Sequence, residues 1–347
     1  MSRGAFISGV GGHLPPRVVT NDDLTALGVV VPRETFAART GIRERRYADE
    51  GIGAGDLAVP ASQAAIASAG LRARDIDIVI MATLSGEQAF PGSALFLQRQ
   101  LGLFQGEEPK AVATMDIRNQ GAGFLFGLST AVAMVGAGAA QHALVVGSEV
   151  QSALLDFSSR GSAATPLFGD GAGAVVVSAS GQDADRGIRR ISLGTDSRGA
   201  DSFFVNLWRV RNRPYLPLVA GRESDAIVPA GDLWPKLDYE AVIATAIDRI
   251  AAELAALVAP QGMTPSDLDL VVLQQTSAEV GRGVADRLHL SPEKILGNVE
   301  KYADTSAAAI PLALSEAQGD GRLRRGMRVA MVAFGAGYVW GAALCDW

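Results

Sequence analysis

The chain has 347 residues, enough for one large domain or two halves with a sizeable core. Apolar residues make up 48% and charged residues 20%, which is typical of a globular protein and excludes a disordered chain. The net charge of −6 argues against bulk attraction to nucleic acid, and no apolar run reaches the roughly 20 residues that span a bilayer. The first residues hold too short an apolar stretch for a signal peptide, so we expect a cytosolic protein.

Helical and strand-like patterns alternate along the chain. Continuous apolar runs predict buried strands, and small-residue or amphipathic runs predict helices. This alternation indicates an α/β protein whose central sheets are covered on both faces. The helix expected at 121–138 is apolar all round, so we expect it to lie between layers. In the first half, in chain order, we expect a helix at 59–70, a strand at 76–85, helices at 94–103 and 121–138, and a strand at 142–149. In the second half we expect a helix at 239–258, a strand at 268–277, helices at 283–290 and 306–318, and a strand at 328–335.

Two pairs of similar segments indicate an internal duplication. The run DIDIV at 75–79 is echoed by DLDLV at 267–271, and FGDGAG at 168–173 is echoed by FGAG at 334–337. The pairs keep their order but differ in spacing, so the halves differ by insertions. We expect an N-terminal half at 1–180 and a C-terminal half at 237–347. The stretch 181–236 between them is irregular, and we expect it either to cover a cleft or simply to connect the halves.

The segment 116–124, DIRNQGAGF, has the layout of a nucleophile elbow. It follows a strand-like run and opens a long small-residue helix, whose N-terminal dipole favours an anion. The residue presented there is Gly121, which has no side chain. The sequence therefore predicts an acyl-transfer scaffold without its usual nucleophile.

Over nearly its full length the chain resembles β-ketoacyl carrier-protein synthase III and its relatives in the thiolase superfamily. The segments that carry the resemblance are RTGIRERRY (39–47), AFPGSA (89–94), DIRNQGAGF (116–124), ALVVGSE (143–149), LDFSSRG (155–161), LFGDGAGA (167–174), ADTSAAAIPLAL (303–314) and FGAGYVWGAAL (334–344). The resemblance implies a thiolase-like five-layered αβαβα fold built from two duplicated halves, and a dimer.

The resemblance also implies three catalytic positions. Relatives use Cys, His and Asn, and the matching residues here are Gly121, Gln274 and Asp304. Gly121 cannot carry an acyl group, and Gln274 cannot exchange a proton near neutral pH, although its amide can hold a carbonyl oxygen. Asp304 is either a general base with a raised pKa or a cap of the following helix.

No other residue replaces the missing nucleophile or base. Cys345, the single cysteine, excludes an internal disulfide and a cysteine metal site, and we expect it to be a small buried residue near the C-terminus. His13, His142 and His289 lie far from the matching position in sequence, so we expect structural or solvated roles for them. We expect no metal site.

Further positions are implied to bind the substrate. Arg39 and Arg160 match residues that clasp the nucleotide end of coenzyme A, with an ion pair to a nearby Glu as the alternative for Arg39. Phe36 stands next to the position of an adenine-stacking Trp. Phe90 matches a residue that reaches into the partner's acyl tunnel, with core packing as its alternative. Phe203 belongs to a loop over the acyl channel.

Two functions remain open. In one, the protein binds an acyl-CoA or acyl-carrier-protein thioester and transfers the acyl group directly to a second substrate, with backbone N–H groups around Gly121 and Gly337 as an oxyanion site. In the other, it is a catalytically silent subunit that pairs with an active relative. The expected setting is secondary-metabolite or fatty-acid-type biosynthesis, as a homodimer or a heterodimer, without a covalently bound cofactor. Glu279 stands where the resemblance implies an Arg that docks the carrier protein, which favours either free coenzyme A thioesters or docking by a partner subunit.

Overall fold

Two five-stranded sheets form the frame of the molecule, which is a computed structural model describing residues 4–104, 110–180, 186–205, 234–274 and 276–347. The strand order of the first sheet is β1-β7-β6-β4-β5, and that of the second, taken from its opposite edge, is β8-β14-β13-β11-β12. The strands of the first sheet are β1 (Ala5–His13), β4 (Ile78–Ala82), β5 (Ala113–Ile117), β6 (His142–Glu149) and β7 (Gly171–Ala179). Those of the second are β8 (Gly187–Thr195), β11 (Leu270–Leu273), β12 (Ile295–Leu296), β13 (Arg328–Gly335) and β14 (Val339–Asp346).

The two sheets have equivalent strand orders, which confirms the duplication. The DIDIV and DLDLV segments lead into β4 and β11, which hold the same place in their sheets. The FGDGAG and FGAG segments likewise lead into β7 and β14. Each sheet combines parallel and antiparallel neighbours, with β4 parallel to both β5 and β6 and β11 parallel to both β12 and β13.

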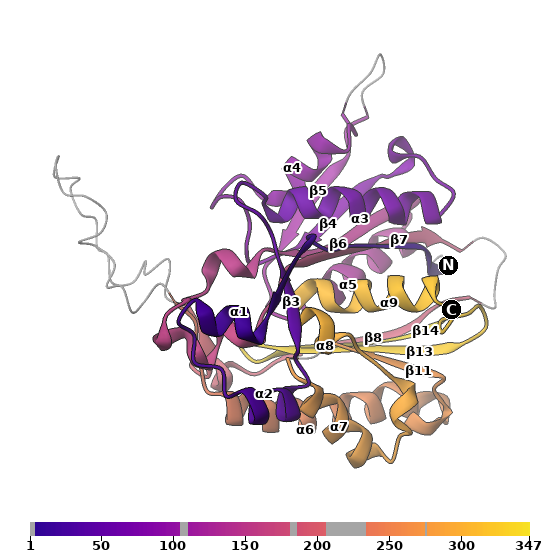
Figure 1. Ribbon diagram of the computed structural model, residues 1–347. Helices are drawn as coiled ribbons and strands as arrows, with labels where there is room; N and C mark the ends of the chain where they lie inside the picture. The colour runs from indigo at the N-terminus through magenta and orange to yellow at the C-terminus, as the bar shows by residue number, and fades with distance from the viewer. Residues whose placement is uncertain (1–3, 105–109, 181–185, 206–233, 275) are drawn as a thin grey trace.

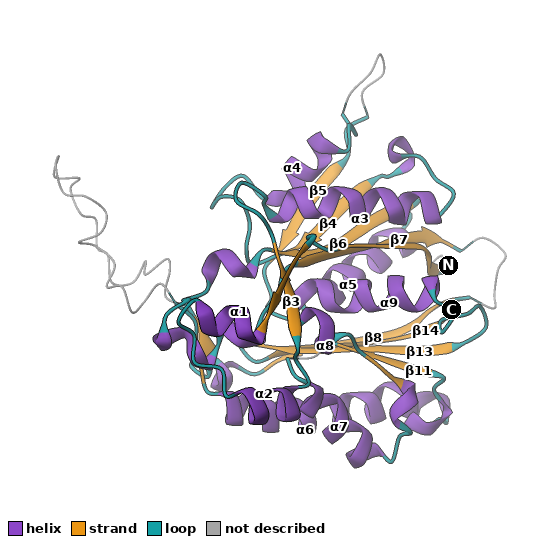
Figure 2. Cartoon of the chain, viewed as in Figure 1, coloured by secondary structure: helices purple, strands orange, loops and turns teal. Residues whose placement is uncertain are grey.

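Helices and sheets stack in five layers, as Figures 1 and 2 show. The outer layer on the first sheet holds α3 (Ala54–Ser68) and α4 (Ser93–Gln100), and that on the second holds α6 (Tyr239–Val258) and α7 (Ala278–Leu288). Between the sheets lie α5 (Gly123–Gly136) and α9 (Ala309–Gly319), which contact both sheets. The predicted thiolase-like αβαβα fold is therefore confirmed.

The central helix α5 lies between the layers as predicted, with one side fully buried. Phe124, Leu125, Leu128, Ala131 and Val135 have no exposed surface, because small residues let both sheets approach the helix closely. Shorter elements cover one end of the sheets: β2 (Arg17–Thr20), α1 (Asn21–Ala26), α2 (Arg33–Thr40), β3 (Glu44–Tyr47), β9 (Phe203–Phe204), β10 (Lys236–Leu237) and α8 (Val299–Tyr302).

The stretch 181–236 is less irregular than the sequence indicated. Its described part includes β8, which pairs with β14 and forms an edge of the second sheet. Ile188 and Ile191 pack against the core, whereas Arg189 and Arg190 face outward. Because charged residues interrupt the apolar residues of this edge strand, the sequence showed no continuous apolar run there. Residues 206–233 of the expected cleft cover lie outside the described residues.

Candidate active site

Two of the three predicted catalytic positions follow the ends of parallel strands, and the third lies in a loop before α9. Gly121 follows β5, Gln274 follows β11 directly, and Asp304 precedes the short 3-10 turn that leads into α9. In open α/β sheets, ligand sites form beyond the carboxyl ends of parallel strands, because several loops converge there. The two sheets present these ends to a common region between them.

Gly121, Gln274 and Asp304 meet in the structure. The Nε2 of Gln274 donates to the Oδ1 of Asp304 at 2.9 Å. A Cβ built on Gly121 would lie 3.2 Å from the Oε1 of Gln274. Only 3% of Gln274 and 3% of Asp304 is exposed, so the group is shielded from bulk water. The predicted positions therefore form one buried cluster.

The backbone at Gly121 suits glycine. Its φ is +68°, and a Cβ there would come within 2.7 Å of the carbonyl oxygen of Phe334. Its N–H donates to the Oγ of Ser306 at 3.0 Å. In this structure the Gly121 N–H is therefore engaged by a hydroxyl, and an incoming oxyanion would have to displace that bond.

Asp304 has a hydrogen bond that suits a helix cap and a raised pKa that is compatible with a general base. Its Oδ1 accepts the Ser306 N–H at 2.7 Å, which satisfies a donor at the start of the 3-10 turn 306–308. Burial raises the pKa of Asp304 to about 6, and the hydrogen bonds from Ser306 and Gln274 only partly offset that rise. The carboxyl therefore caps the 3-10 turn and also titrates closer to neutral pH than an ordinary Asp.

A cavity of about 730 Å³ opens beside this cluster. Its walls include Gln120, Gln151 and Phe168, each of which neighbours Gly121 or Asp304 in sequence or by contact. Phe203 also lines it and stacks on Phe168 with ring centroids 5.6 Å apart. This size and mixed lining suit an organic substrate.

Sequence reasoning missed Glu149, which also lines the cavity. It is the last residue of β6 and is 1% exposed. Burial raises the pKa of Glu149 to about 7, against the opposing effect of hydrogen bonds from Ser85 and Leu84. The signal was an acidic residue closing the apolar run ALVVGS, since ionisable groups are seldom buried without a partner or a role.

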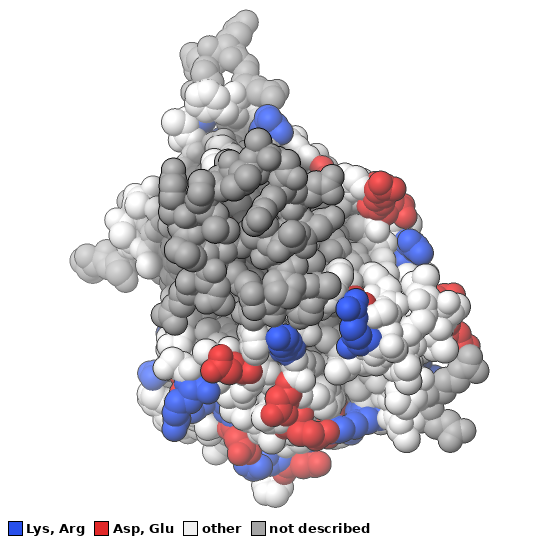
Figure 3. Space-filling model, turned by 90° about the vertical axis from the view of Figure 1, so that its left-hand side faces the viewer, with Lys and Arg blue, Asp and Glu red and all other residues white. Residues whose placement is uncertain are grey.

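The residues expected to bind coenzyme A are spread over the surface. Arg39 donates to both carboxylate oxygens of Glu240 at 2.6 Å and to Glu279 at 2.9 Å, and it lies over the ring of Tyr239. These carboxylates raise the pKa of Arg39 further, Glu240 most. The ion pair given as the alternative for Arg39 is therefore present. Figure 3 likewise shows basic and acidic side chains intermixed on this side of the molecule.

The other predicted residues take varied positions. Arg160 is exposed and pairs with Asp156 at 3.1 Å, and Phe36 is half-buried against the cluster around Val19 and Leu24. Phe90 is 84% exposed, so core packing within its own chain does not explain it. Gly337 lies in the turn between β13 and β14, next to the cavity residue Ala336.

Cys345 lies away from the site. It pairs with Val329 at the far end of β14, roughly 20 Å of strand from the turn at Gly337. It is buried as expected, and burial raises the pKa of its thiol to about 12. Among the described residues, no group of three or more His, Cys, Asp or Glu could hold a metal ion. In the same part of the chain, no helix has the length and apolarity to cross a membrane.

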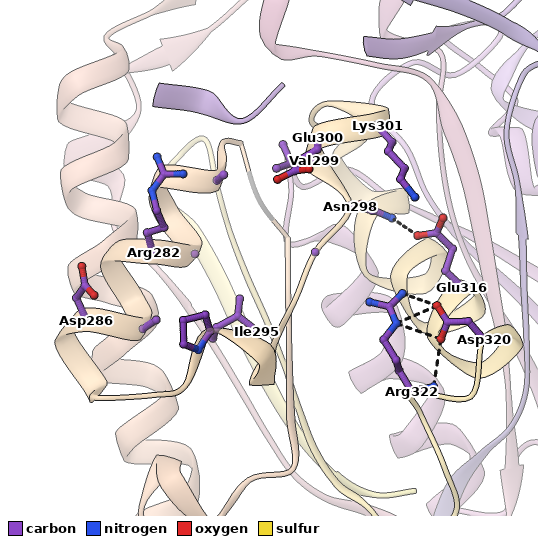
Figure 4. A pocket seen from close by; sticks show the side chains of 15 residues that line it. Arg282, Asp286, Ile295, Asn298, Val299, Glu300, Lys301, Glu316, Asp320 and Arg322 are labelled. Atoms are coloured by element: carbon purple, nitrogen blue, oxygen red, sulfur yellow. Dashed lines mark hydrogen bonds and ion pairs between the residues drawn. The ribbon is translucent and has the colours of Figure 1, made fainter. Parts of the chain in front are cut away.

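A second cavity, of about 780 Å³, lies between α7, α8 and the end of α9 (Figure 4). Charged side chains line it, and several are already paired. Arg322 pairs with Asp320 at 2.6 Å, and Glu316 accepts from Asn298 and Tyr302. None of the predicted site residues lines this groove, so we place the candidate active site in the first cavity.

A buried site between two equivalent mixed sheets defines a protein of the thiolase-like class. The chain belongs to the β-ketoacyl-[acyl-carrier-protein] synthase III family. Family models for 3-oxoacyl-[acyl-carrier-protein (ACP)] synthase III match residues 115–197, and those for its C-terminal part match residues 258–347.

Relatives match along the whole chain. Beta-ketoacyl-[acyl-carrier-protein] synthase III of Rhodospirillum centenum is 36% identical, with 99% of both chains covered. The crystal structure of 3-oxoacyl-[acyl-carrier-protein] synthase III from Aquifex aeolicus superposes with a TM-score of 0.86 at 30% identity, covering 99% of this chain and 100% of that one. The crystal structure of the priming β-ketosynthase from the R1128 polyketide biosynthetic pathway superposes with a TM-score of 0.84 at 27% identity, covering 99% of this chain and 96% of that one.

Proposed function

We propose that this protein transfers an acyl group from a thioester directly to a second substrate, without a cysteine nucleophile. The relatives are named as synthases that act with an acyl carrier protein, so an acyl thioester, of coenzyme A or of a carrier protein, is the proposed donor. On the resemblance, the catalytic Cys, His and Asn positions hold Gly121, Gln274 and Asp304. A covalent acyl-enzyme cannot form on glycine, so both substrates would be bound together.

The observation that carries this proposal is the cavity of about 730 Å³ beside two buried carboxyl groups with raised pKa values, Asp304 and Glu149. Burying two carboxyl groups opposes folding, so their presence beside the cavity favours a chemical role over a silent site. Groups that titrate near neutrality can exchange protons with a substrate. The proposed setting is fatty-acid-type or secondary-metabolite biosynthesis.

Release of free coenzyme A tests the proposal. The purified protein would be supplied with a panel of acyl-CoA thioesters, with and without acceptors, beside an Asp304→Ala variant. We expect acceptor-dependent release that is lost in the variant, because Asp304 holds both Gln274 and Ser306 in place. Absence of release from every thioester, tested also with acyl carrier protein donors, would refute it.

A silent subunit remains the second candidate, and one observation favours it. The site residues satisfy one another: Gln274 and Ser306 donate to Asp304, and Gly121 donates to Ser306. A protein that only shapes a partner's tunnel would need these residues to be structurally satisfied, but would not need them to react with a substrate. It would bind acyl thioesters without turnover and would raise the activity of a synthase that carries an intact Cys, His and Asn.

The proposed dimer would use the edge of the first sheet. Strand β5 ends this sheet, and Met115 on it is 40% exposed. Phe90 before α4 and Leu95 on α4 are further exposed apolar residues. An unpaired apolar edge invites pairing with another strand. We expect Met115→Lys to convert a dimer to a monomer in light scattering, whereas Val18→Lys, at an exposed apolar residue on β2, leaves it dimeric. A wild-type monomer at micromolar concentration would contradict this assignment.

The carboxylates around Arg39 should weaken nucleotide binding. Neutralising both in a Glu240→Gln, Glu279→Gln variant releases Arg39 for a phosphate, and we expect the KM for acyl-CoA to fall roughly two- to fivefold, as suits an exposed ion pair. An acyl-pantetheine thioester lacks the nucleotide, so its KM should not change. An equal change with both donors would show that Arg39 does not contact the nucleotide.

A further inference from the structure

The two carboxyl oxygens of Glu149 differ in their hydrogen bonds. Its Oε2 accepts from the Oγ of Ser85 at 2.6 Å and from the N–H of Leu84 at 3.1 Å. Its Oε1 is buried, yet among the described residues it has no hydrogen-bond donor in bonding geometry. A buried carboxyl oxygen without a donor is costly, and it requires a partner from water or from a ligand.

The open oxygen belongs to a side chain that lines the cavity of about 730 Å³. By contrast, Asp304 is not among the cavity-lining residues, and its Oδ1 already accepts two donors. Ser306 links the two carboxyl groups, because its N–H donates to Asp304 while its hydroxyl accepts from Gly121 and lies near Glu149. Of the two carboxyl groups, Glu149 is therefore the one placed to touch a substrate.

The charges around the cavity restrict what can bind beside Glu149. Three lining residues are acidic, Glu87, Asp116 and Glu149, whereas Arg118 is the one basic residue that lines the described wall. A substrate carrying its own carboxylate would be repelled from such a site. A neutral hydroxyl or amine can instead donate its hydrogen to the open oxygen.

We infer that Glu149 is the catalytic base of the transfer and that the acceptor is a neutral alcohol or amine, not a carboxylate-bearing extender. This inference rests on the proposed acyl transfer. The acceptor oxygen or nitrogen attacks the thioester carbonyl carbon while its proton passes to the Oε1 of Glu149. The carbon–sulfur bond then breaks, and the departing thiolate takes that proton. The products are an ester or amide and a free thiol, and the carboxylate is regenerated.

The test is Glu149→Gln, which keeps the size of the side chain and an oxygen for Ser85 and Leu84 but cannot take the proton. We expect kcat with alcohol or amine acceptors to fall on the order of 10²-fold or more, while the Kd for a non-hydrolysable acyl-CoA analogue is unchanged. Glu316→Gln is the matched control, because Glu316 also accepts from a hydroxyl but lines the second cavity (Figure 4). We expect it to keep wild-type activity.

A spectroscopic measurement covers the case in which the variant is poorly folded. The infrared band of a protonated carboxyl should titrate near neutrality in the wild type, should be missing in Glu149→Gln, and should shift when an alcohol acceptor is added. Glu87, Asp116 and, beyond Ser306, Asp304 are the other titratable carboxyl groups around the site, so their Asn or Gln variants assign the band.

The outcomes separate the two proposals. Wild-type transfer that survives Glu149→Gln, or a preference for a malonyl-type acceptor, overturns the role of Glu149 and leaves acyl transfer standing. Absence of wild-type transfer with every acceptor overturns the proposed function and this inference together.

Discussion

Replacing Asp304 by Asn is expected to stabilise the protein above pH 6 while lowering its turnover. The carboxyl is buried, and its pKa of about 6 in the folded protein exceeds the ordinary value of 3.8. Ionisation of a buried group with a raised pKa therefore opposes folding. An Asn at this position keeps an oxygen for Ser306 and Gln274 but carries no charge.

The sign of the pH dependence follows from the two pKa values. Below about pH 4, Asp304 is protonated in both states and contributes no penalty. Between about pH 4 and pH 6 the unfolded chain loses the proton first, so the stability of the wild type falls as pH rises. Above about pH 6 the difference is constant, on the order of 3 kcal/mol in favour of Asn.

Thermal unfolding of both proteins across this range checks the prediction. The difference in midpoint between Asp304→Asn and wild type should be small near pH 4 and should grow up to about pH 6.5. The comparison between two proteins cancels the titration of other carboxyl groups. Turnover should fall roughly 10- to 100-fold, because Gln274 and Ser306 lose their charged anchor. A variant less stable than wild type at pH 8 would show that Asp304 is ionised at little cost.

The frame of the molecule could be predicted from the sequence because it depends on periodic patterns. The apolar runs at 142–149 and 328–335 and the amphipathic run at 239–258 coincide with β6, β13 and α6. Strand β8 was missed, since an edge strand with Arg189 and Arg190 on its outer face lacks a continuous apolar run. Local pattern does not tell an edge strand from a loop.

The site was predicted in part. The positions of Gly121, Gln274 and Asp304 came from family resemblance, and the structure brings them together. The partners of Arg39 and the open oxygen of Glu149 could not be read from sequence, because they depend on residues 60 to 240 positions apart in the chain. Such contacts exist only once the halves have packed.

Restoring the family residues at all three positions is expected to restore covalent acylation. On the proposed assignment, Gly121→Cys alone places a thiol next to Gln274 and close to the Asp304 carboxyl, which disfavours the thiolate. The triple variant, with Gln274→His and Asp304→Asn, removes that negative charge and supplies an imidazole. A cysteine at the start of α5 also benefits from the helix dipole.

A cysteine at position 121 would be strained, because the backbone there has a conformation that favours glycine. With φ at +68° and the Phe334 carbonyl oxygen 2.7 Å from the Cβ position, Gly121→Cys should destabilise the fold by about 1–3 kcal/mol unless the loop shifts. Compared with Gly121→Cys, Asp304→Asn in the triple variant offsets part of that loss above pH 6. The triple variant should therefore melt above the single variant at pH 8.

Intact-protein mass measurement after incubation with acetyl-CoA or a longer acyl-CoA reads the result directly. We expect an acyl adduct on the triple variant, formed at least 100-fold faster than on Gly121→Cys, since an activated thiolate replaces a neutral thiol. Cys345→Ser in both backgrounds ensures that the adduct is on residue 121. We expect this change not to lower the acylation, because Cys345 is buried and burial raises the pKa of its thiol. Equal acylation of the single and triple variants would mean that Gln274 and Asp304 do not suppress a nucleophile at this position. The glycine at position 121 would then account by itself for the missing acyl-enzyme.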